Sequence, residues 1–129
     1  MWKNTIVLFY NMIVCIMLSK KNRLDKISFQ WVFKKGRRKE FPYFNLIFLK
    51  NTDLTENKFG FVVSSKISKK AVVRNKLKRR AKSVVFKILN NLNEPSVSIF
   101  IFKKESLNLD FSALFKEIEH SLKEVRLIK

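Results

Sequence analysis

The feature that most constrains the fold of this chain is an apolar stripe inside its most basic segment. Between Asn57 and Asn93 the sequence has eleven Lys or Arg residues and no acidic residue. On a helical wheel of about 100° per residue, one stripe of this segment is apolar. Its members are Val73, Leu77, Ala81, Val84, Ile88 and Leu92. A disordered basic tail would lack this periodicity, so we expect a helix over about residues 70–92 that packs through one face.

The cations of this helix are expected on the side opposite the apolar stripe and along the edges of the stripe. The side opposite the stripe carries Asn75, Lys78, Arg79 and Lys82. Arg74 and Arg80 lie on its two edges. A cationic face on a folded helix suits the phosphates of a nucleic acid. The formal net charge of +18 agrees, because a compact chain tolerates such self-repulsion best beside a polyanion. A solvated helix face without a ligand is the alternative interpretation.

The rest of the chain is patterned as short helices and strands of one α+β domain, which suits its 129 residues. The expected order is a helix over 24–35, a basic turn over 36–42, strands over 43–50 and 58–65, the basic helix, a strand over 96–103 and a last helix. Gly36 is expected to end the first helix. Asp110 is expected to cap the last one. The apolar run of residues 96–103 favours a central strand.

The N-terminal segment has a different character. Residues 5–18 read TIVLFYNMIVCIML and are almost entirely apolar. Fourteen residues are too few to cross a bilayer core of about 30 Å as a helix, and no small-residue cleavage site of a signal peptide follows. We interpret residues 1–16 as an extension or a mis-assigned start, and residues 17–129 as the domain. A membrane tether is the alternative.

The sequence offers no recognisable protein-borne catalytic site. It has neither a GxxxxGK[ST] phosphate loop nor an HExxH zinc motif. Cys15 is the only cysteine and His120 the only histidine, and we expect His120 to be solvated on the last helix. The basic segment contains no carboxylate pair that would hold Mg²⁺ for a nuclease reaction. We therefore expect no catalytic residue, no metal held by the protein and no small-molecule substrate.

The order of residues in the basic helix carries more information than its composition. Residues 69–80 read KKAVVRNKLKRR, which resembles the RNR signature of the bacterial ribonuclease P protein component. Residues 21–36 resemble the N-terminal helix of that family, and residues 59–64 resemble the strand before its motif. The similarity covers about residues 17–127. Lys76 stands where the signature often has Arg, which keeps the charge and loses the forked geometry.

The resemblance implies an αβββαβα sandwich with a left-handed βαβ crossover. It also implies a role as the protein subunit of ribonuclease P, which assists a catalytic RNA subunit in removing the 5′ leader from precursor tRNA in the cytoplasm. The protein alone would be inactive. Mg²⁺ would be required and would be held mainly by RNA.

The resemblance further implies two RNA-binding surfaces. The RNA subunit would contact Lys69, Lys70, Arg74, Asn75, Lys76, Lys78, Arg79, Arg80 and Lys82. The single-stranded leader would lie in a cleft that includes Phe29, Phe33 and Lys66, because bases stack on aromatic rings without sequence readout. By spacing alone, Phe29 and Phe33 are as consistent with a core position. Two departures weaken the match: Ser65 replaces a frequent Lys, and Ile47 replaces a Tyr that some members carry in the cleft.

Two other functions compete with this interpretation. A small structural RNA-binding protein of the ribosomal type would share the basic helix, but it would have neither the aromatic cleft nor a precursor-tRNA partner. A membrane-associated basic protein would use residues 5–18, although we expect no membrane partner.

Overall fold

The computed structural model describes residues 26–50, 57–92 and 95–128. Its helices and strands are α2 (Lys26–Lys35), β1 (Arg37–Glu40), β2 (Phe44–Lys50), β3 (Lys58–Val62), α3 (Ala71–Ile88), β4 (Ser96–Phe102) and α4 (Phe111–Glu124). Two short 3₁₀ helices, η2 (Leu89–Asn91) and η3 (Lys104–Asn108), follow α3 and β4. This order confirms the expected αβββαβα arrangement. Residues 1–16 and Leu24 lie outside the described residues.

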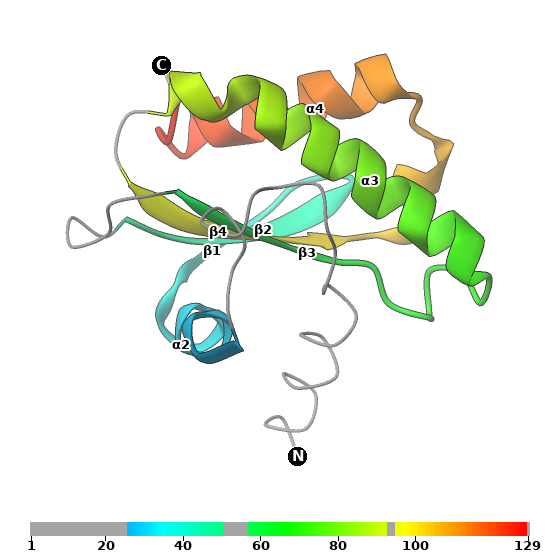
Figure 1. The fold of residues 1–129 in the computed structure, drawn as a ribbon, viewed down its shortest axis with the longest axis horizontal. Helices are drawn as coiled ribbons and strands as arrows, with labels where there is room; N and C mark the ends of the chain where they lie inside the picture. Colours follow the sequence, from blue (N-terminus) through cyan, green and yellow to red (C-terminus); the bar gives the residue numbers. More distant parts are fainter. Residues whose placement is uncertain (1–25, 51–56, 93–94, 129) are drawn as a thin grey trace.

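The four strands form one sheet in the order β1-β2-β4-β3. β4 pairs antiparallel with β2 and parallel with β3, so the expected central position of residues 96–102 is confirmed. The parallel pair requires a crossover, and α3 supplies it. Figure 1 shows α2 on one face of the sheet and α3 with α4 on the other.

Helices on both faces explain why β4 and β3 are buried along almost their whole length. In β3 the last four residues are all buried, so both faces of this strand contribute to the core, not only the face of Phe59 and Phe61. Aromatic rings fill much of the space between the layers. Phe44 packs edge-on against Phe100 at 5.2 Å between ring centroids, and Phe61 stacks on Phe100 at 5.7 Å.

The expected basic turn over residues 36–42 is wrong in part, because Arg37–Glu40 forms the edge strand β1. It pairs antiparallel with β2, with Arg37 opposite Phe48 and Glu40 opposite Asn45. All four residues of β1 are exposed, so the segment shows none of the apolar alternation that indicates a strand. Charged side chains are typical of an edge strand, where they discourage pairing with another chain.

Helix α4 has a defined signal at each end. Its start is the expected one, since the Asp110 carboxylate accepts a hydrogen bond from the Ala113 N–H at 2.7 Å. Its end is a Schellman motif, in which the Leu127 N–H donates to the Leu122 carbonyl and the Arg126 N–H donates to the Lys123 carbonyl. Arg126 has a φ of 64° in this motif, a conformation usually taken by glycine.

Gly36 joins α2 to β1 in a space that has no room for a side chain. A Cβ at this position would lie 2.6 Å from the Val32 carbonyl oxygen and 2.8 Å from Cγ2 of Ile47. The first of these atoms belongs to the backbone and cannot move without bending α2. Gly36 therefore allows the close approach of α2 to β2, in addition to its expected role of ending the helix.

We predict that Gly36→Ala lowers the free energy of unfolding by about 1–3 kcal/mol, because the backbone must shift to admit the methyl group. Urea denaturation measures the change. Ser65→Ala at an exposed position is the control and should stay within about 0.5 kcal/mol of the original protein. Native stability of Gly36→Ala would show that α2 is free to move away from β2.

Candidate nucleic-acid interface

Helix α3 packs through the apolar stripe that the sequence predicts. Leu77, Ala81, Val84 and Ile88 are all buried, while Val73 and Leu92 at the two ends of the stripe are partly exposed. α3 contacts both β3 and α4. The stripe therefore fixes the orientation of the helix, and with it the direction of the cations.

Most of the predicted phosphate-binding residues are available to a ligand. Those with exposed side chains are Lys66, Lys69, Lys70, Asn75, Lys76 and Arg79. Arg74 and Arg80 are half-buried, in agreement with their expected positions at the edges of the stripe. These residues lie on α3 and on the connection that leads into it from β3, so one continuous stretch of chain presents them.

Two of the residues predicted to contact RNA are buried instead of exposed. Lys78 is 6% exposed and Lys82 is 2% exposed, so the expectation that both lie on the side facing solvent is wrong. The predicted stripe omitted Val85, which is fully buried. Lys78 precedes Val85 by seven residues and Lys82 precedes it by three, which places them on the same edge of the helix. The buried face of α3 is therefore wider than the predicted apolar stripe. The aliphatic part of a lysine side chain can pack within such a face.

Arg74 has a structural contact in addition to its place in the basic motif. Its guanidinium donates from Nη1 to the Ser68 carbonyl oxygen at 2.8 Å. The Lys70 N–H donates to Oγ of Ser68 at 3.2 Å, so both bonds hold the turn before α3. Arg74 thus orients the segment that carries Lys69 and Lys70. Its remaining N–H groups can still meet a phosphate.

The exposed side of α3 also carries apolar residues that were not singled out from the sequence. Phe86 is 63% exposed and Val72 is 76% exposed. Both lie off the apolar stripe, and that position is the signal that could have identified them. Exposed apolar surface among cations suits a ligand that has bases as well as phosphates.

The aromatic pair of α2 is only partly accessible. Phe29 is fully buried in the core, so its expected place on the wall of a cleft is not found, and Ile47 is buried as well. Phe33 is half-buried, and its ring stacks on that of Phe29 at 5.9 Å. The buried ring supports the outer one, so only Phe33 can meet a ligand from this pair.

Arg38 covers Phe33 and was missed in the sequence because β1 was read as a turn. Its Cζ lies 4.9 Å from the centroid of the Phe33 ring, and its Nη2 donates to the Phe33 carbonyl oxygen at 2.8 Å. Both contacts fix the guanidinium on the ring. Arg38 is exposed, so it presents a planar cation to solvent beside α2.

His120 is exposed, as expected, and its Nε2 lies 3.3 Å from a carboxylate oxygen of Glu124. Within the described residues, no group of three or more His, Cys, Asp or Glu side chains is arranged to hold a metal ion. In the same part of the chain, no helix has the length and apolar character needed to cross a membrane. Cys15 and the apolar residues 5–18 lie outside it.

Comparison with known proteins identifies a family. The family model Ribonuclease P matches residues 18–126. The ribonuclease P protein component of Rickettsia bellii is 36% identical over 111 residues, covering 81% of this chain and 90% of that relative. A component from Listeria monocytogenes is 33% identical over 113 residues, covering 87% of this chain and 94% of the relative.

Solved structures agree on the fold. The RNase P protein of Staphylococcus aureus superimposes with a TM-score of 0.76 at 24% identity, covering 84% of this chain and 98% of that one. The RNase P protein of Thermotoga maritima gives a TM-score of 0.67 at 27% identity, covering 74% and 89%.

The positions of Arg79 and Lys82 predict opposite outcomes for two substitutions on one helix. Arg79→Ala should change the free energy of unfolding by less than about 0.5 kcal/mol. It should weaken RNA binding and reduce the slope of log affinity against log salt by about 0.7–0.9. Lys82→Ala should cost about 1–3 kcal/mol of stability, because its buried stem is lost.

Thermal or urea unfolding and RNA titrations at several salt concentrations measure both effects. Lys82→Met keeps a long unbranched side chain and should lose less stability than Lys82→Ala. If Lys82→Ala has native stability and binds RNA as weakly as Arg79→Ala, Lys82 is exposed and contacts RNA.

Proposed function

The chain belongs to the family of ribonuclease P protein components, and from this premise we propose that it assists a ribonuclease P RNA in removing the 5′ leader from precursor tRNA. Its partners would be the RNA subunit and the precursor tRNA. We further propose that it works in the cytoplasm, where these RNAs would meet. The protein would act by binding and charge neutralisation, and the RNA subunit would perform the cleavage.

The observation that carries this proposal is the exposure of the cations of the RNR-like motif. Lys69, Lys70, Lys76 and Arg79 reach solvent from one stretch of chain, while the apolar stripe anchors that stretch to the sheet. Two RNA molecules repel each other through their phosphates. A rigid row of cations bound to one of them lowers this repulsion and releases counterions.

We propose that Mg²⁺ is bound mainly by RNA in the assembled enzyme. This hard cation prefers oxygen ligands, keeps several waters and commonly binds through phosphates. The protein would reduce the Mg²⁺ concentration that the RNA needs, because its cations neutralise part of the same phosphate charge. No residue of the protein needs to touch the reacting phosphate in this arrangement.

For the leader, we propose a stacking site built from Arg38 and Phe33, and we propose Lys66 as a phosphate contact on the connection that follows β3. The Phe33 ring stacks on Phe29 at 5.9 Å between centroids, and Cζ of Arg38 lies 4.9 Å from the Phe33 centroid. An incoming base would therefore lie on the Arg38 plane or replace it on the ring. Arginine planes and aromatic rings both stack with unpaired bases without reading their sequence.

The direct test is a reconstitution. We expect the purified full chain to stimulate 5′-leader removal when it is added to a bacterial ribonuclease P RNA at low Mg²⁺. The chain without RNA should not cleave precursor tRNA. Arg79→Ala should stimulate less at equal protein concentration and recover at higher concentration, since it loses affinity rather than chemistry. Absence of stimulation by the folded chain would refute the proposed function.

The leader site makes a separate prediction. Arg38→Ala should weaken precursor-tRNA binding by about 1–3 kcal/mol and leave mature-tRNA binding unchanged, because only the precursor carries a leader. Arg38→Lys is the matched control that keeps the charge and removes the plane, and it should recover only part of the loss. Equal losses for precursor and mature tRNA would show that Arg38 contacts the tRNA body instead.

A further inference from the structure

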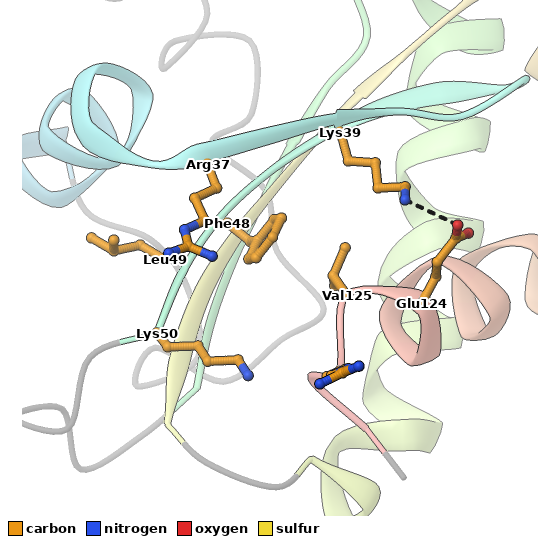
Figure 2. A pocket seen from close by; sticks show the side chains of 8 residues that line it. Arg37, Lys39, Phe48, Leu49, Lys50, Glu124 and Val125 are labelled. Carbon is orange, nitrogen blue, oxygen red and sulfur yellow. Dashed lines mark ion pairs between the residues drawn. The ribbon is translucent and has the colours of Figure 1, made fainter.

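A basic pocket lies away from both of these surfaces, between the β1–β2 edge of the sheet and the C-terminal end of α4. Figure 2 shows the side chains that line it, and its volume is about 590 Å³. Its lining residues are Arg37, Lys39, Phe48, Leu49, Lys50, Glu124, Val125 and Arg126. None of them lies on α2 or α3. The volume is in the range of sites that enclose small organic ligands or single nucleotides.

Three separate elements bring cations to this pocket. Arg37 and Lys39 alternate along β1 and point to the side away from Arg38, which lies on Phe33 of α2. Lys50 ends β2, and Arg126 follows α4. The acid among them is Glu124, whose carboxylate lies 3.0 Å from Nζ of Lys39. Four cations against one acid make the pocket a site for an anion.

The backbone conformation of Arg126 independently supports a binding role for this pocket. A φ of 64° is unfavourable for a residue with a Cβ, and glycine is the usual residue at this position of a Schellman motif. Glycine would end α4 with less strain, but it would bring no charge to the pocket. Residues held in such conformations cluster at binding sites, where the surrounding structure maintains them. The strained position places the Arg126 side chain at the pocket.

We propose that this pocket binds a nucleotide segment of RNA, with its phosphates on Arg37, Lys50 and Arg126 and its apolar part against Phe48. The proposal rests on the proposed function, because that function makes RNA the partner. The pocket would be a third contact with RNA, on a part of the fold that shares no residue with the α3 surface or with the leader site. The RNA subunit and the precursor tRNA both offer this chemistry.

Glu124 has a defined place in this arrangement. The hydrogen bond and charge of Lys39 hold the pKa of Glu124 below its usual range, so the carboxylate stays ionised at neutral pH. A bound phosphate would compete with it for Lys39. Glu124 therefore opposes RNA binding, and its removal should act in the direction opposite to the removal of a cation.

Arg126→Gly separates the effect on binding from the effect on folding. It removes the guanidinium, and it also removes the strain of the positive φ, so stability should not fall. We expect a melting temperature equal to or above that of the original protein. RNA affinity should fall roughly fivefold near 0.1 M salt, and the salt slope should decrease by about 0.7–0.9, as for one lost phosphate contact. Lys104→Ala removes one exposed cation outside the pocket and is the control for net charge.

Two further variants test the same pocket through other side chains. Lys50→Ala should lower affinity as Arg126→Gly does, and Glu124→Gln should raise it. Each variant is titrated with a bacterial ribonuclease P RNA alone and with precursor tRNA alone, and the RNA that shows the loss is the one that occupies the pocket. The proposal is overturned if Arg126→Gly and Lys50→Ala bind both RNAs no more weakly than Lys104→Ala. In that case a defect in Arg79→Ala would leave the proposed function intact.

Discussion

The pairing of β4 with both β2 and β3 is the interaction on which the rest of the structure depends. Seven residues of β4 pair antiparallel with β2, and five residues of β3 pair parallel with β4. The parallel pair obliges the chain to cross over the sheet, and α3 makes that crossing. The sheet is covered on both faces, so β3 and β4 are almost completely buried. This crossing lays α3 on the sheet, and the buried stripe of the helix then directs its exposed cations outward.

The sequence predicts those parts of the fold that depend on local pattern. The stripe from Leu77 to Ile88 defines α3, and Asp110 marks the start of α4 through a bond to a residue three positions away. β1 was missed because an exposed edge strand needs no apolar alternation. Its existence depends on pairing with β2, which no window of the sequence contains.

In the candidate site, too, some features follow from local sequence pattern and others depend on tertiary contacts. The exposed cations of the motif follow from helical periodicity, but the burial of Lys78 and Lys82 depends on what covers α3 beyond its apolar stripe. Arg38 was missed for a different reason: its partner Phe33 belongs to another element, and the contact exists only once α2 and β1 meet at Gly36. The pocket around Arg126 likewise joins residues from both ends of the described chain. Tertiary arrangement, rather than residue type, creates these sites.

The tight packing at Gly36 has a consequence for recognition. Gly36 donates a hydrogen bond to the Val32 carbonyl, and Phe29 and Val32 of α2 are fully buried, so α2 cannot swing away from the sheet without exposing core side chains. The stack of Phe29, Phe33 and Arg38 is therefore assembled before any ligand arrives. A flexible strand of RNA loses much conformational freedom when it binds, but the protein side of this site has little left to lose. The entropic cost of recognition then falls almost wholly on the RNA.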